Sequence, residues 1–168
     1  MTPQEFQTVY PLVLSWIRET LATHSMAAKP VSSVGFARLP QYFGTELLAS
    51  TKFVAVDKIP MPPLSALGLT QFANFESGDF AGITYLDTFF LKKGHSAEER
   101  LYFHELIHIV QWRLLGPERF LATYADGLEK CGYRDSPLEI MAYSAEAAFV
   151  QSDNIFAAKK FVAKQLGM

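Results

Sequence analysis

The chain has 168 residues, of which 49% are hydrophobic and 19% are charged, and its formal net charge is −2. This balance excludes a disordered chain and is typical of a globular domain. The basic residues are scattered, so we expect no nucleic-acid partner. The single cysteine, Cys131, excludes an internal disulfide and a cysteine-based zinc site.

The N-terminal segment is expected to form an amphipathic helix. Apolar side chains recur at helical spacing over residues 4–24, and Pro11 is expected either to bend this helix or to delay its start. The segment lacks a basic leader followed by an apolar run, and no stretch approaches the roughly 18 apolar residues of a membrane span. We therefore expect a cytoplasmic protein without a membrane partner.

The middle of the chain carries the strand signals. Residues 31–39 and 51–57 are expected to form short strands, with a turn or short helix between them around residues 42–49. The proline-rich residues 59–63 are expected to run extended as a surface loop. Residues 83–91 (ITYLDTFFL) are rich in β-branched and aromatic side chains and predict the clearest strand of the chain.

From Ser96 onward the pattern becomes helical. Ser96 and Glu99 match the S-x-x-E capping box, and Gly116 followed by Pro117 is a stop signal. These signals predict a helix over residues 97–115.

Two further helices are expected, over residues 117–128 and from Pro137 to about residue 150. No repeat or long linker divides the chain, so we predict a single α+β domain over residues 1–168 with a small antiparallel or mixed sheet. Its expected parts are an N-terminal helix (1–28), a strand-rich part (31–91) and a helical part (96–168).

The sequence His104-Glu105-Leu106-Ile107-His108 lies within the predicted helix 97–115. Residues four apart on a helix share a face, so both imidazoles can reach one zinc ion. Glu105 is offset around the helix, where its carboxylate can accept a proton from a water that the ion has acidified. We therefore predict a single Zn²⁺ held by the two histidines, with Glu105 as the general base, over the alternative that the histidines are ordinary core or surface residues.

A catalytic zinc site usually has a third protein ligand and one open position. Glu139 on the helix after Pro137 is the expected third ligand, although Ser136-x-x-Glu139 is itself a capping box that would use this carboxylate. Glu146, on the same helical face, is the alternative ligand. His24 and His95 are expected to lie outside the ligand set.

Three further side chains are candidates for supporting roles. Gln111 shares the helical face of the two histidines and is expected either to orient a ligand or to form an ordinary polar contact at the pocket edge. Tyr143 and Tyr133 are candidate donors to the oxyanion of a hydrolytic intermediate, or else core tyrosines.

These residues resemble the zincin metallopeptidases, specifically the gluzincin pattern of H-E-x-x-H followed by a glutamate on a later helix. The segments HELIHIVQW and SPLEIMAY are similar to small, mostly uncharacterised bacterial zincin-like proteins with H-E-L-x-H-x-x-Q and a later P-x-E-x-E-A. The resemblance covers about residues 83–145. It implies His104, His108 and Glu139 as ligands and Glu105 as base.

The resemblance also implies that residues 83–91 border a cleft and can pair with an extended peptide. The chain departs from the pattern at Met141, where a second acidic residue is usual. The expected function is zinc-dependent hydrolysis of peptide bonds in a peptide or protein substrate. The alternatives are an inactive zincin-like module that binds metal or regulates a partner, and a metal-free interaction protein built on residues 4–24.

Overall fold

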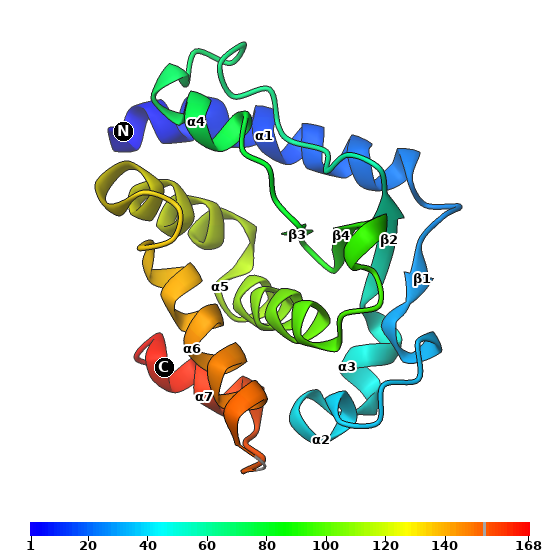
Figure 1. Ribbon diagram of the computed structural model, residues 1–168. Coiled ribbons are helices and arrows are strands. Elements are labelled where there is room, and N and C mark those ends of the chain that lie inside the picture. Colours follow the sequence, from blue (N-terminus) through cyan, green and yellow to red (C-terminus); the bar gives the residue numbers. More distant parts are fainter. Residues whose placement is uncertain (153) are drawn as a thin grey trace.

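The computed structural model describes residues 1–152 and 154–168, and Figure 1 shows the arrangement of its elements. The α-helices are α1 (Pro3–Thr23), α2 (Leu39–Phe43), α3 (Thr45–Ser50), α4 (Ala73–Glu76), α5 (Glu99–Cys131), α6 (Pro137–Gln151) and α7 (Ala158–Gln165). The strands are β1 (Lys29–Pro30), β2 (Lys52–Val56), β3 (Gly82–Tyr85) and β4 (Thr88–Lys92). Single turns of 3₁₀ helix are η1 (Val31–Ser33), η2 (Thr70–Phe72) and η3 (Lys93–His95).

The N-terminal helix predicted over residues 4–24 is confirmed as α1. Its start is fixed by a capping box, in which the Thr2 hydroxyl accepts from the Glu5 N–H at 3.2 Å and the Glu5 carboxylate accepts from the Thr2 N–H at 2.7 Å. The helix continues through Pro11. Its buried face, which includes Val13 and Ile17, belongs to the hydrophobic core.

The sheet is mixed, as expected, with strand order β1-β2-β4-β3. β2 and β4 are parallel, whereas β3 and β4 are antiparallel. The single strand predicted over residues 83–91 is wrong, because Leu86 and Asp87 turn the chain and split it into the hairpin β3–β4. Leu86 adopts a φ of 58°, a conformation that leucine rarely takes and that its sequence does not signal.

The strand predicted over residues 31–39 is also wrong. Only Lys29 and Pro30 pair with β2, and Val31–Ser33 then form η1. Gly35 turns the chain with a φ of 81°, and Pro40 lies in the first turn of α2, where its missing N–H costs nothing. The strand predicted over residues 51–57 is confirmed as β2.

The break predicted at Gly116 divides α5 into two parts. Gly116 has a φ of 73° and a ψ of 166°, which interrupts the helix between residues 99–115 and 117–131. The capping box predicted for Ser96 and Glu99 is wrong, because the helix begins at Glu99 itself. The Ser96 hydroxyl instead donates to the Lys93 carbonyl at 2.8 Å.

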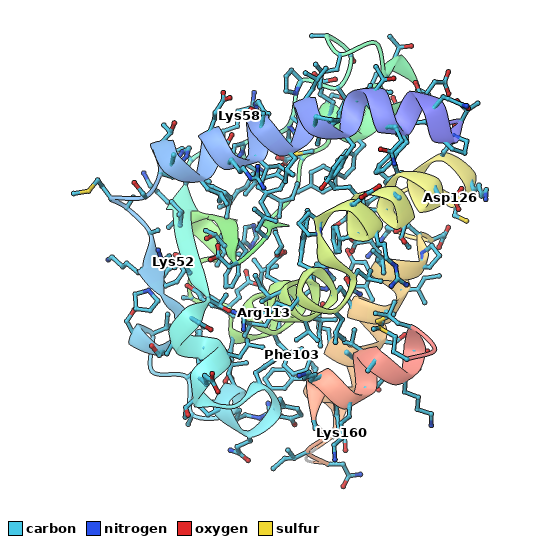
Figure 2. The ribbon with its side chains drawn as sticks, turned by 180° about the vertical axis from the view of Figure 1, so that it is seen from behind. Lys52, Lys58, Phe103, Arg113, Asp126 and Lys160 are labelled. Atoms are coloured by element: carbon cyan, nitrogen blue, oxygen red, sulfur yellow. The ribbon has the colours of Figure 1, made fainter. Side chains whose placement is uncertain are left out.

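The first part of α5 is the central element of the molecule. All residues from Tyr102 to Trp112 are buried, so neighbouring elements enclose the helix on every side. Leu114, two residues further on, is only half-buried. Figure 1 shows this part between the sheet and α6, and Figure 2 shows Phe103 in the interior. The Phe103 ring stacks on Phe149 of α6, with the ring centroids 4.3 Å apart.

The α6 helix begins at Pro137 and packs along α5. The alternative capping box of Ser136 and Glu139 does not form, because Ser136 makes no side-chain cap and its buried hydroxyl has no hydrogen-bond partner among the described residues. The Glu139 carboxylate is therefore not used at the helix terminus. Within residues 1–152 and 154–168, no helix has the length and apolarity needed to cross a bilayer.

Candidate metal centre

The two imidazoles of the H-E-x-x-H segment converge. His104 and His108 lie one turn apart on the first part of α5, and their Nε2 atoms are 3.2 Å from each other. Both rings are buried, with 4% and 5% of each residue exposed. Two ring nitrogens at this distance need either a shared proton or a cation between them.

Glu139 of α6 joins the same point. One carboxylate oxygen, Oε2, lies 3.3 Å from His104 Nε2, and the other, Oε1, lies 3.3 Å from His108 Nε2. Ligand atoms about 2.0–2.1 Å from a tetrahedral zinc ion lie about 3.3 Å from one another. The spacing of the two nitrogens and the carboxylate therefore fits one such ion.

The three side chains offer ligand atoms that all lie within 4.8 Å of one another. The Oε2 atom of Glu139 is buried and has no hydrogen-bond partner among the described residues. A buried carboxylate oxygen without a partner is costly, and a cation is one of the few groups that would offset this cost. The donor set is thus suited to hold a divalent metal ion.

Each imidazole is oriented by an acceptor at its other nitrogen. His104 Nδ1 lies 3.0 Å from Glu146 Oε2, and His108 Nδ1 lies 2.8 Å from Gln111 Oε1. Because the Gln111 amide nitrogen donates to the Leu138 carbonyl at 2.9 Å, its oxygen faces the ring and can only accept. The Nδ1 atoms therefore carry the protons, which leaves the Nε2 lone pairs for a metal.

Glu146, the alternative ligand, is not part of the converging group. Its Oε2 accepts from the outer nitrogen of His104, and its Oε1 accepts from the Arg100 guanidinium at 2.8 Å. Arg100 also lies 3.1 Å from Glu98 Oε2, so a chain of charged groups leads from His104 toward the surface. Glu146 therefore contacts the outer side of the His104 ring and offers no atom to the converging group.

Glu105 lies on the same helix as the two converging imidazoles and is held by β3. Its Oε2 accepts a 2.6 Å hydrogen bond from the Thr84 hydroxyl. Its Oε1 faces Gly82, where an added Cβ would lie 2.5 Å away. Burial raises the pKa of Glu105, against the opposing attraction of His104 and His108. A raised pKa brings this carboxylate nearer to the range in which a general base works at neutral pH.

The electrostatics of the group favour positive charge at its centre. Burial disfavours the imidazolium, but the adjacent carboxylates of Glu139 and Glu146 raise the pKa of His104 to about 10. Burial also opposes the Glu139 carboxylate, yet the two imidazoles hold its pKa well below the ordinary value. In the metal-free protein protons supply this positive charge, and a divalent cation would displace them.

Sequence reasoning missed two groups that hold the centre, Thr84 and Tyr124. The buried Tyr124 hydroxyl donates to Glu139 Oε1 at 2.7 Å. Tyr124 comes from the second part of α5 and Thr84 from the hairpin, and no local pattern links either residue to the helix that bears His104. Only the packing of these elements brings the groups together.

The remaining predicted residues lie around the centre or away from it. The Tyr143 ring packs against His104 with centroids 4.6 Å apart, and Tyr133 packs against Phe80 at 4.7 Å. Met141, the departure from the zincin-like pattern, places its sulfur 3.3 Å from the Gln111 amide nitrogen.

His24, His95 and Cys131 are not in the converging group. His24 bonds the Thr20 carbonyl, His95 pairs with Glu98, and Cys131 is exposed at the end of α5. Neither histidine offers an atom to the converging group.

Comparisons of the chain with protein-family models, with curated proteins and with solved structures gave no match.

Proposed function

We propose that this chain is a zinc-dependent peptidase in which His104, His108 and Glu139 hold one Zn²⁺. One observation carries the proposal: two Nε2 atoms and the Glu139 carboxylate lie 3.2–3.3 Å from one another, and both histidines are bonded at Nδ1. Three protein ligands are the number that catalytic zinc sites use, since a fourth position stays open.

A zinc ion bound there would polarise the substrate carbonyl and acidify a water molecule. Glu105 takes the proton of the attacking water and passes it to the leaving amine. Thr84 engages Oε2 of Glu105, so Oε1 is the atom left to carry the proton. The raised pKa of Glu105 suits it to both steps, because a weaker acid is a stronger base.

The fold assignment and the compartment belong to the same proposal. A motif helix packed on a mixed sheet and a later helix that carries a glutamate support the zincin-like class. The tyrosines remain candidates for the oxyanion, with Tyr143 at the His104 ring and Tyr133 among Phe75 and Phe80. We retain the cytoplasm as the proposed location and an unidentified peptide or protein as the substrate.

Substitution of the base tests the peptidase. Glu105→Gln should keep one zinc per chain, measured by mass spectrometry, and lower kcat/KM on a cleaved library peptide by about 10²–10⁴-fold. The matched control is Glu46→Gln, an exposed glutamate of α3, which should leave both quantities unchanged. Hydrolysis by Glu105→Gln at the wild-type rate would rule out the assigned role.

The burial of the centre favours a second candidate, a metal-binding module without hydrolysis. Glu105 is only 3% exposed and His104 only 4%, so a substrate needs a path through the surrounding side chains. The two candidates differ in a single experiment. Stoichiometric zinc without cleavage of a broad peptide library would select the module, whereas cleavage that is lost in Glu105→Gln selects the peptidase.

A further inference from the structure

An internal cavity adjoins the candidate metal centre. Its volume is about 110 Å³, and its walls come from α1, from the segment of residues 62–80, from β3 and from the second part of α5. Glu105, His108 and Glu139 line one end of the cavity. Figure 1 shows α1 and the segment that bears α4 on the same side of β3. Because both contribute residues to the cavity wall, we call α1 and residues 62–80 its roof.

The walls away from the centre are apolar. Phe6, Val13 and Leu69 from the roof face Leu121 and Leu128 from α5. Among the described residues, no lysine, arginine or aspartate lines the cavity. A charged or strongly polar group seated between these walls, away from Glu105 and Glu139, would therefore lose its hydration without gaining a partner.

The polar atoms of several wall residues are already engaged elsewhere. The Tyr85 hydroxyl donates to the Pro60 carbonyl at 2.8 Å, and the Trp112 indole N–H donates to the Thr84 carbonyl at 3.2 Å. The Tyr124 hydroxyl is taken by Glu139. These aromatic side chains thus turn carbon surfaces toward the cavity.

The roof is attached beside the centre by aromatic contacts. Phe75 packs on Tyr124 with ring centroids 5.8 Å apart, and Phe80 packs on Tyr133 at 4.7 Å. Tyr124 in turn bonds the proposed ligand Glu139. The cavity and the proposed reaction centre therefore share walls, and a group seated in one lies next to the other.

The size of the cavity limits its guest. An apolar cavity of about 150 Å³ engineered into another protein stays dry and binds benzene. The cavity here is somewhat smaller, so it suits one branched aliphatic or aromatic group rather than a long chain.

We propose that the cavity selects the substrate by taking one bulky apolar group, of leucine or phenylalanine size, carried next to the bond that is cleaved. The cleavage half of this inference rests on the proposed peptidase function. It assigns a role to α1 and to residues 62–80, because they form the roof and thereby set which group fits.

Binding of benzene tests the pocket without any reaction. We expect millimolar benzene to shift methyl NMR signals of cavity residues, Ala125 among them, equally in the zinc-loaded and in the zinc-stripped wild-type protein. Ala125 lines the cavity, so Ala125→Phe should weaken binding at least tenfold. The matched control is Ala148→Phe on an exposed position of α6, which should bind benzene like wild type.

Leu121→Phe is a second variant that fills the cavity, and it adds less side-chain volume than Ala125→Phe. It should also weaken benzene binding. If neither zinc form of the protein binds benzene, or if both filling variants bind it as wild type does, the cavity is an ordinary packing void and the inference is wrong.

Hydrolysis of a peptide series tests the selection. Peptides that differ only at one residue flanking the cleaved bond should be cut at least tenfold faster with leucine or phenylalanine there than with glycine, aspartate or lysine. Ala125→Phe should remove this preference while zinc content is unchanged. Equal rates across the series overturn the selection, whereas benzene binding without cleavage of any peptide overturns the peptidase and leaves the apolar pocket standing.

Discussion

The metal centre and the roof of the adjoining cavity are held by different kinds of interaction. At the centre, His104, His108 and Glu105 each have a directional polar partner at 2.6–3.0 Å. Residues 59–69, which lead into and form the first part of the roof segment 62–80, contain no helix or strand. They pack largely through apolar side chains. The comparison teaches that hydrogen bonds fix the positions of the side chains at the centre, whereas apolar packing sets the shape of the cavity.

The largest expected effect is the loss of zinc from a variant that changes the centre alone. His108→Ala removes one of the three proposed ligands, so zinc content should fall from one per chain to a trace, while the apolar roof keeps the fold. His95→Ala, which changes a histidine outside the group, should keep full zinc content. Equal zinc in the two variants, measured by mass spectrometry after dialysis, would contradict the assigned ligands.

The second prediction concerns the stability of a variant that changes the roof alone. Ile17 of α1 is 1% exposed, so Ile17→Ala should lower the free energy of unfolding by about 2–5 kcal/mol. The half-exposed Leu12→Ala on the same helix should change it by no more than about 0.5 kcal/mol. Urea unfolding gives both values. The folded Ile17→Ala protein should still bind one zinc, and loss of the metal there would mean that the two regions are not separable.

The third prediction probes the contact between the sheet and the base. A Cβ at Gly82 would lie 2.5 Å from Glu105 Oε1 and 3.0 Å from its Cδ, so Gly82→Ala should displace the carboxylate. A shift of this kind is expected to lower kcat/KM about 100-fold while zinc is retained. Gly94→Ala is the control, because an added Cβ there has no neighbour within 4 Å. Unchanged rates of hydrolysis in both variants would show that the contact between Gly82 and Glu105 does not affect catalysis.

The smallest expected effect concerns Tyr124, the residue that touches both regions. Tyr124→Phe keeps the ring in the cavity wall but removes the 2.7 Å hydrogen bond to Glu139. Zinc affinity, measured by competition with a chelator, should fall about tenfold. Tyr10→Phe on α1 should leave it unchanged. An unaltered affinity in Tyr124→Phe would show that Glu139 needs no support from α5.

The same two regions differ in how far the sequence predicts them. His104 and His108 could be predicted to share a face because helical spacing is a local property. The hydrogen bonds of Thr84 and Tyr124 could not, because they depend on how β3 and the second part of α5 pack on the helix. Residues 62–80 carry turn signals but no pattern that indicates what they cover.

Some local sequence patterns also failed to predict the structure. Ser96 satisfies the Lys93 carbonyl instead of capping α5, and Ser136 leaves Glu139 free for the centre. The hairpin turn at Leu86 could not be predicted from the sequence, because leucine is not a typical turn residue. The Ser96 bond is itself local, whereas the contacts of Glu139 are set by tertiary packing.

The central claim is that His104, His108 and Glu139 share one metal ion. A crystal structure with anomalous data collected at the zinc edge tests it most directly. The account predicts a single strong peak about 2.0–2.1 Å from both Nε2 atoms and from an oxygen of Glu139. Crystals soaked in zinc that show no peak at this point, or imidazoles that turn away from each other, would contradict it.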